Sequence, residues 1–175
     1  MNIGEVLTAD CANGLGMRVS VFVSGCLNHC KGCFQPQTWE FDYGIPYDGV
    51  VEQKILDELA MPYYDGLTIL GGEPFEIQNQ ETVAALIGRV KKELPARNIW
   101  MYTGYTYDRD LVLGGCRYTK FTDSILDQID ILVDGRFVEE RKNLCLKFRG
   151  SENQRIIDMR QTRAAGKVVL SPLNN

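Results

Sequence analysis

The sequence predicts an α/β protein: a partial, open (β/α) barrel with a mostly parallel sheet. Short apolar runs alternate with helical stripes along the chain, and turns rich in glycine or cysteine follow several of these runs. Alternation of strands and helices favours parallel pairing. A complete eight-unit barrel usually needs ~250 residues. The 175 residues of this chain therefore fit a barrel that is partial and open.

The elements follow one another in a regular order. Residues 18–24 are predicted to form a strand buried on both faces, because the run is almost continuously apolar. Helical spacing of apolar residues predicts helices over 50–59 and 80–94, the second ended by Pro95. A short helix over 122–129 is expected to begin at Thr122 or Asp123 as its cap. Further strands are predicted at 67–70, 98–102, 129–133 and 167–170.

Three motifs come directly after predicted strands, at Val23, Leu70 and Val133. The carboxyl ends of parallel strands lie at one edge of a sheet, which is where α/β folds carry their sites. We expect the three motifs to meet there.

Composition limits the classes of function. Hydrophobic residues make up 45% of the chain and charged residues 24%, which is typical of one globular domain, here expected to span 1–175. The net charge is −4 and the basic residues are scattered, so nucleic acid is not expected as a partner. No apolar run approaches the ~20 residues of a membrane span, and the first residues do not resemble a signal peptide. We expect a cytoplasmic protein with no membrane partner.

The six cysteines divide into a cluster and three isolated residues. In a chain without an export signal, clustered thiols indicate metal or redox chemistry ahead of disulfides. Cys26, Cys30 and Cys33 lie within eight residues, whereas Cys11, Cys116 and Cys145 have no nearby cysteine. The isolated three are expected to be small buried hydrophobic residues.

The spacing Cys26-x3-Cys30-x2-Cys33 places three thiolates in one short loop. Thiolates are the preferred ligands of soft metal centres. A [4Fe-4S] cluster held by three cysteines keeps one iron open, and an open position distinguishes a reactive metal site from a structural one. The alternative is structural zinc, with His29 or a distant cysteine as the fourth ligand. If His29 binds no metal, we expect it to be a solvent-facing loop residue.

A second motif, Gly71-Gly72-Glu73-Pro74, follows a predicted strand. Two glycines let a backbone approach a ligand closely, and the Glu73 carboxylate offers acceptors to an ammonium group. Taken alone, the motif is equally typical of an ordinary strand-to-helix turn.

Together, the cysteine spacing and this glycine motif resemble the radical S-adenosylmethionine superfamily. Further motifs, in their order and spacing, resemble the activating proteins of anaerobic ribonucleoside-triphosphate reductase over residues of about 8 to 158, with 159–175 as an extension. These motifs are Asn13-Gly14-Leu15-Gly16-Met17-Arg18, Phe22-Val23-Ser24-Gly25-Cys26, Thr38-Trp39, Thr103-Gly104-Tyr105, Val133-Asp134-Gly135-Arg136-Phe137, Phe148-Arg149-Gly150-Ser151 and Asn153-Gln154.

The resemblance implies a function and a set of roles. A reduced [4Fe-4S] cluster on Cys26, Cys30 and Cys33 would cleave S-adenosylmethionine, and the resulting radical would take hydrogen from a glycine of the reductase. An electron donor such as flavodoxin or ferredoxin is implied. The residues implied to contact the cofactor are Gly32, Cys33 and Phe34 near the adenine, Gly71, Gly72, Glu73 and Pro74 at the methionyl amino group, Asp134 and Arg136 at the ribose and carboxylate, and Thr103 and Tyr105.

Some interpretations stay open. Asp134 and Arg136 also suit a surface turn with a solvated ion pair, and Tyr105 suits the core. Gly32 and Gln35 depart from residues common in the wider superfamily, but neither departure removes a cluster ligand. Other short radical enzymes, similar to pyruvate formate-lyase activase or 7-carboxy-7-deazaguanine synthase, are one alternative function, and a zinc-stabilised binding module is another.

Overall fold

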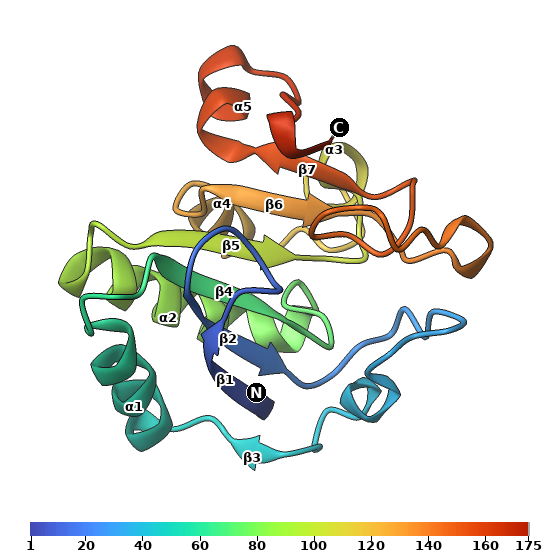
Figure 1. The fold of residues 1–175 in the computed structure, drawn as a ribbon. Helices are drawn as coiled ribbons and strands as arrows, with labels where there is room; N and C mark the ends of the chain where they lie inside the picture. The colour runs from blue at the N-terminus through green and yellow to red at the C-terminus, as the bar shows by residue number, and fades with distance from the viewer. Residues whose placement is uncertain (175) are drawn as a thin grey trace.

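The structure is a computed structural model, and it describes residues 1–174. One sheet of seven strands forms its centre, in the order β3-β1-β2-β4-β5-β6-β7 (Figure 1). The strands are β1 (Asn2–Asp10), β2 (Arg18–Val23), β3 (Ile45–Pro46), β4 (Gly66–Gly71), β5 (Asn98–Tyr102), β6 (Ile131–Asp134) and β7 (Arg155–Asp158). The α-helices are α1 (Gly49–Leu59), α2 (Ile77–Glu93), α3 (Tyr107–Asp110), α4 (Thr122–Leu126) and α5 (Met159–Ala165). Short 3-10 turns occur at Pro36–Trp39, Glu139–Arg141 and Pro172–Asn174.

The sheet is open and mixed, which limits the predicted architecture. The α/β class is confirmed, and β2, β4, β5 and β6 pair in parallel as expected. However, β1 is antiparallel to both β2 and β3, and β7 is antiparallel to β6. Neither a mostly parallel sheet nor a barrel is confirmed. The parallel order is restricted to the strands that helical crossovers connect, whereas connections without an α-helix lead to the antiparallel strands at both edges.

The two faces of the central strands serve different purposes. Val19, Ile69 and Met101 belong to the core under the helices. Neighbouring residues point to the opposite face, because side chains alternate along a strand, and among them Leu70 and Tyr102 line a cavity. Parallel strands therefore have one face packed against helices and the other available for a site.

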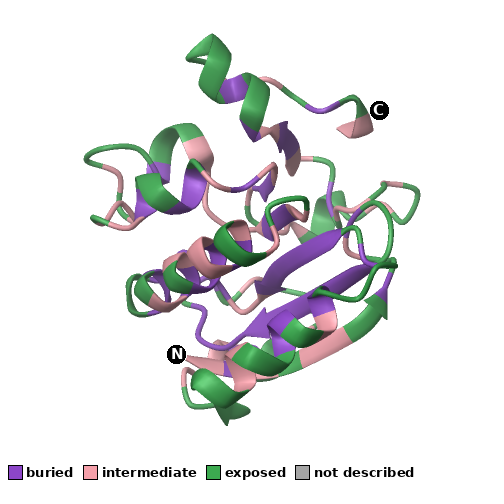
Figure 2. Cartoon of the chain, turned by 90° about the vertical axis from the view of Figure 1, so that its left-hand side faces the viewer, coloured by how far each residue is buried: buried purple, intermediate pink, exposed green. Residues whose placement is uncertain are grey.

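Helices α1 and α2 cover the packed face through regularly spaced apolar residues (Figure 2). Helix α1 begins after Asp48, whose carboxylate accepts hydrogen bonds from the N–H groups of Val50 and Val51. The core-facing residues of the two helices are Ile55, Leu56 and Leu59 of α1 and Val83, Leu86, Ile87 and Val90 of α2. Their outward faces are exposed, which gives each helix the amphipathic pattern that its sequence indicates.

Several predicted elements need correction. The chain forms no strand at 167–170, where only Leu170 makes an isolated bridge, to Ile157. Helix α4 ends at Leu126 and has no side-chain cap, because the Thr122 hydroxyl donates instead to the side chain of Gln80. Strands β1 and β7 were not predicted. Among residues 1–174, the structure contains no helix long and apolar enough to span a membrane.

Candidate functional site

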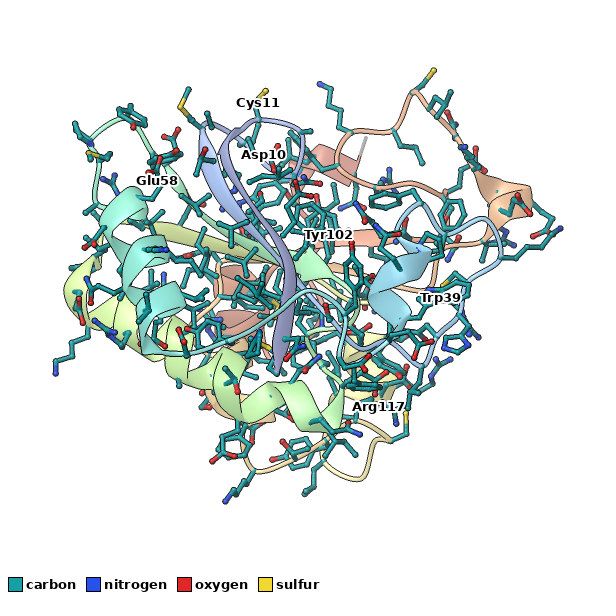
Figure 3. All side chains as sticks on the ribbon, turned by 90° about the horizontal axis from the view of Figure 1, so that it is seen from below. Asp10, Cys11, Trp39, Glu58, Tyr102 and Arg117 are labelled. Atoms are coloured by element: carbon teal, nitrogen blue, oxygen red, sulfur yellow. The ribbon has the colours of Figure 1, made fainter. Side chains whose placement is uncertain are left out.

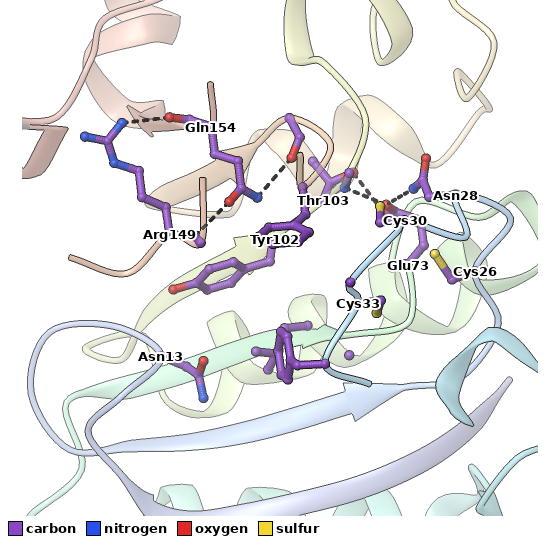
Figure 4. A pocket seen from close by; sticks show the side chains of 18 of the residues that line it. Asn13, Cys26, Asn28, Cys30, Cys33, Glu73, Tyr102, Thr103, Arg149 and Gln154 are labelled. Carbon is purple, nitrogen blue, oxygen red and sulfur yellow. Dashed lines mark hydrogen bonds between the residues drawn. The ribbon is translucent and has the colours of Figure 1, made fainter. Parts of the chain in front are cut away.

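A cavity of about 450 Å³ opens on the uncovered face of the sheet (Figure 4). Its walls come from five places far apart in the sequence. These are the loop after β1, the cysteine loop after β2 with Trp39, the turn after β4, the turn after β5 and the segment that follows β6. The predicted meeting of motifs at the carboxyl edge is therefore confirmed for the first two strands. From the motif after β6, Gly135 lines the cavity.

All three clustered cysteines line this cavity. Backbone hydrogen bonds fix the loop at both ends: the Cys26 N–H donates to the carbonyl of Trp39 at 3.1 Å, and the Cys33 N–H donates to the carbonyl of Cys30 at 3.1 Å. Gly25, with φ of +94°, allows the sharp entry into the loop, and a Cβ there would lie 2.2 Å from the ring of Phe41. Burial raises the pKa of the Cys26 thiol to about 12.

His29 does not complete a zinc site. It is exposed, as predicted, and its ring stacks on Trp39 with 4.6 Å between centroids. Among residues 1–174, no three His, Cys, Asp or Glu side chains are grouped to hold a single metal ion. The zinc alternative thus has no preformed site in the described chain. A four-iron cluster is wider, since each thiolate binds a different iron.

Glu73 is fully buried and ties three strand ends together. One carboxylate oxygen accepts from the Phe75 N–H at 3.0 Å and the Thr103 hydroxyl at 2.7 Å. The other accepts from the Asn28 amide at 3.1 Å and the Gly104 N–H at 2.7 Å. A carboxylate has about four acceptor positions, so protein donors use all of them. Burial still dominates and raises the pKa of Glu73 to about 7.

The two glycines of the same motif let the turn after β4 lie against the turn after β2. Gly71 has φ of +102°, and a Cβ on it would lie 2.7 Å from the backbone of Phe22. A Cβ on Gly72 would lie 2.7 Å from the carbonyl oxygen of Gly25. The Glu73 N–H donates to that carbonyl at 2.9 Å. The glycines are therefore needed for contact between the two motifs, and both also line the cavity.

The remaining predicted residues divide between the cavity and its surroundings. Gly32, Phe34 and Thr103 line the cavity. Pro74 is buried and does not line it. Tyr105 also lies outside the lining, and its hydroxyl donates to Glu76 at 2.9 Å.

Asp134 and Arg136 lie outside the cavity lining as well. Asp134 is fully buried and binds the Arg155 guanidinium at 2.8 and 2.5 Å, while also accepting from the Tyr107 N–H at 2.8 Å. Asp134 therefore forms an ion pair, as the alternative interpretation expects, but the carboxylate is buried rather than solvated and its partner is Arg155. Arg136 is exposed. A cofactor contact by Tyr105, Asp134 or Arg136 stays a prediction.

Sequence reasoning missed several residues of the cavity. The Asn28 amide donates a hydrogen bond to Glu73. It also lies so close to Gly104 that a Cβ at that position would be 2.5 Å from the amide nitrogen, so a side chain there would clash. Tyr102 lines the wall with a buried hydroxyl that has no hydrogen-bond partner within residues 1–174. Phe148, Arg149 and Gln154 also line the cavity, and Figure 4 shows Arg149 and Gln154 at the end away from the cysteines. Their motif carried the family resemblance, but nothing in it indicated a cavity.

The isolated cysteines were predicted to be buried, and this is wrong. Cys11, Cys116 and Cys145 are all exposed. Cys11 lies on the loop after β1, well apart from Trp39 and the cysteine loop (Figure 3). Exposure of a small thiol follows from its place in a surface loop, which isolated cysteines in a sequence do not reveal.

Comparison with known proteins identifies the family. The model of a 4Fe-4S single cluster domain matches residues 12–157. The anaerobic ribonucleoside-triphosphate reductase-activating protein of Haemophilus influenzae is 39% identical over 156 residues, which cover 88% of this chain and 96% of that protein. This chain belongs to that family. The activating proteins of Escherichia coli K12 and of Enterobacteria phage T4 are each 34% identical, over 91% and 89% of this chain and 100% and 93% of their own lengths.

The family model covers residues 12–157, which agrees with the range of about 8 to 158 over which the motifs resemble this family. The match indicates that the chain contains a 4Fe-4S cluster domain. The residues present fit such a group. Three cysteine residues line one cavity, and thiolates are the ligands that an iron-sulfur cluster takes.

Proposed function

We propose that this chain activates an anaerobic ribonucleoside-triphosphate reductase by generating a glycyl radical on it. The observation that carries the proposal is the meeting of Cys26, Cys30 and Cys33 with the Gly71-Gly72-Glu73 turn in one cavity, within a member of this family. The chain acts as a single radical S-adenosylmethionine domain over 1–175, with 159–175 as its extension.

Cys26, Cys30 and Cys33 would hold a [4Fe-4S] cluster with one open iron, at which S-adenosylmethionine would bind. When bound, the two groups would supply one-electron reductive cleavage of the carbon-sulfur bond, with methionine and, after a hydrogen atom is taken from a glycine of the reductase, 5′-deoxyadenosine as products. One electron enters per cleavage, from a donor such as flavodoxin or ferredoxin.

The residues of the chain bind and orient these groups. Cys26 must lose its proton when it becomes a ligand, because the thiolate is the form that binds metal. The backbone of Gly71 and Gly72 contacts the methionyl group, while Gly32 and Phe34 contact the adenine side. Glu73 and Thr103 act by position: they keep the turn after β4 in register with the cysteine loop and the turn after β5.

The test is anaerobic reconstitution with iron, followed by low-temperature electron paramagnetic resonance of the reduced protein with and without S-adenosylmethionine. We expect a four-iron signal that changes when the cofactor is added, and a glycyl radical signal when the reductase is present. A protein that takes up one zinc and no iron contradicts the cluster. A protein that cleaves the cofactor but never radicalises the reductase contradicts the proposed substrate and favours another short radical enzyme.

A further inference from the structure

The segment of residues 136–150, named here the rim loop, borders the cavity on the side opposite the sheet. Lys142, Leu144, Leu146 and Phe148 of this loop line the cavity. The loop folds back on itself through a bridge between Lys142 and Ser151 and a hydrogen bond from the Asn143 N–H to the Gly150 carbonyl at 3.2 Å. It is therefore an ordered wall of the site.

The rim loop also touches the cysteine loop. Lys31, which lies between Cys30 and Gly32, forms ion pairs with Glu139 at 3.0 Å and Glu140 at 3.2 Å. The cysteine loop and the rim loop thus both border the cavity and are joined at Lys31. A protein segment that reaches the cysteines through the mouth of the cavity passes beside both loops.

Charge is unevenly distributed between the rim loop and the rest of the chain. Residues 136–149 contain five Lys or Arg and two Glu, a net charge of +3, whereas the whole chain has a net charge of −4. Both acidic residues are already paired with Lys31. Within residues 1–174, Arg136, Arg141, Lys142 and Lys147 are exposed and form no salt bridge, and no residue of the chain hydrogen-bonds to their side chains.

Two apolar side chains at the same mouth are unusually exposed. Leu144 of the rim loop is 87% exposed and Phe34 of the cysteine loop is 78% exposed, yet both line the cavity. Large exposed apolar residues beside unpaired cations, here Leu144 with Arg141, Lys142 and Lys147 of the same loop, are typical of an interface with apolar anchors and a charged rim.

We propose that the rim loop is the docking surface for the protein substrate and binds an acidic segment of that partner next to the glycine that enters the cavity. This inference rests on the proposed function. Arg141, Lys142 and Lys147 attract the acidic segment, and Leu144 and Phe34 cover apolar side chains of the entering strand. Complementary charge steers encounter and fixes register, and apolar anchors supply most of the affinity.

The experiment compares a double charge reversal, Arg141→Glu with Lys147→Glu, with a matched control, Lys54→Glu with Lys92→Glu. Neither rim residue lines the cavity, and the two control lysines are equally exposed and free of salt bridges within residues 1–174. The dissociation constant for the reductase is measured by calorimetry at low and at high salt. Glycyl radical yield is measured twice, once with a protein electron donor and once with dithionite, which replaces that donor.

We expect the rim variant to raise the dissociation constant roughly tenfold at low salt and less at high salt, because salt screens charges on exposed side chains. Its iron content, and its cleavage of S-adenosylmethionine without the reductase, stay at the level of the unmodified protein. The control binds the reductase normally. A third variant, Leu144→Ser, weakens binding to a similar extent at both salt concentrations, because its contribution is apolar.

An unchanged dissociation constant for the rim variant would overturn the proposal. So would a glycyl radical yield that falls with a protein electron donor but is normal with dithionite, because the rim loop would then bind the electron donor. If the unmodified protein fails to cleave the cofactor at all, the proposed function fails, and the binding measurement on its own still decides whether the rim loop docks the reductase.

Discussion

Glu73→Gln tests the buried carboxylate that ties the three strand ends together. Burial raises the pKa of Glu73 from 4.5 to about 7 in the folded protein. A carboxyl whose pKa is higher when folded binds protons more tightly in the native state. Native stability is then greatest at low pH and falls as the pH rises from the unfolded pKa to the folded one.

The size of the effect follows from the shift. One pKa unit corresponds to about 1.4 kcal/mol, and integration between about pH 5 and about pH 8 gives a loss of about 2.5 kcal/mol in the free energy of unfolding. The glutamine side chain has the same shape and does not titrate. The variant should therefore lose about 2.5 kcal/mol less than the unmodified protein over the same pH interval.

The assay is urea unfolding of the iron-free protein at both pH values, for the unmodified chain and the variant. For each protein, the change in the free energy of unfolding between the two pH values is measured. Subtracting one change from the other removes the contribution of every titrating group that Glu73 does not influence. Equal pH changes in the two proteins would refute the reasoning, because they would mean that Glu73 is ionised throughout and that its four hydrogen bonds outweigh its burial.

Other predictions concern single side chains. Cys30→Ala should abolish both the brown iron-sulfur chromophore and cofactor cleavage, since two thiolates should not retain the cluster. The control variant Cys145→Ala should keep both. An active Cys30→Ala protein would contradict the assignment of the cluster ligands. In iron-free protein near neutral pH, an alkylating agent should modify Cys26 last, because burial raises its pKa to about 12; peptide mass spectrometry that finds it modified early would contradict this. Asp134→Ala should lower the free energy of unfolding by about 3 kcal/mol, because it removes the buried partner of the Arg155 guanidinium and the acceptor of the Tyr107 N–H, while Arg155 keeps its ion pair with Asp108. Iron content should not change, and calorimetry with S-adenosylmethionine shows whether Asp134 also contacts the cofactor.

The central part of the fold was predictable because its signals are local. Strands β2, β4, β5 and β6 and helices α1 and α2 follow from apolar periodicity and from glycine or proline at their ends. Strand β1 alternates weakly, its edge partner β3 has two residues and was also not predicted, and β7 has four residues. Their pairing depends on partners far away in the sequence, as for Ile156 with Val133. Such contacts leave no periodic pattern, so β1 and β7 were missed, and with them the antiparallel edges.

The same division between local and distant signals holds for the site. The thiols are placed by spacing within one loop, and that spacing alone brings them to one cavity. The part played by Glu73 depends on Asn28, Thr103 and Gly104, which follow other strands. The sequence suggested a carboxylate that is free to accept from a ligand, and the structure shows one whose acceptor positions are used by its own chain. A buried acceptor with four donors from three strand ends restricts how those ends can move relative to one another. Glu73 therefore fixes the geometry of the cavity, and under the proposed function the glycine backbone beside it is what contacts the cofactor.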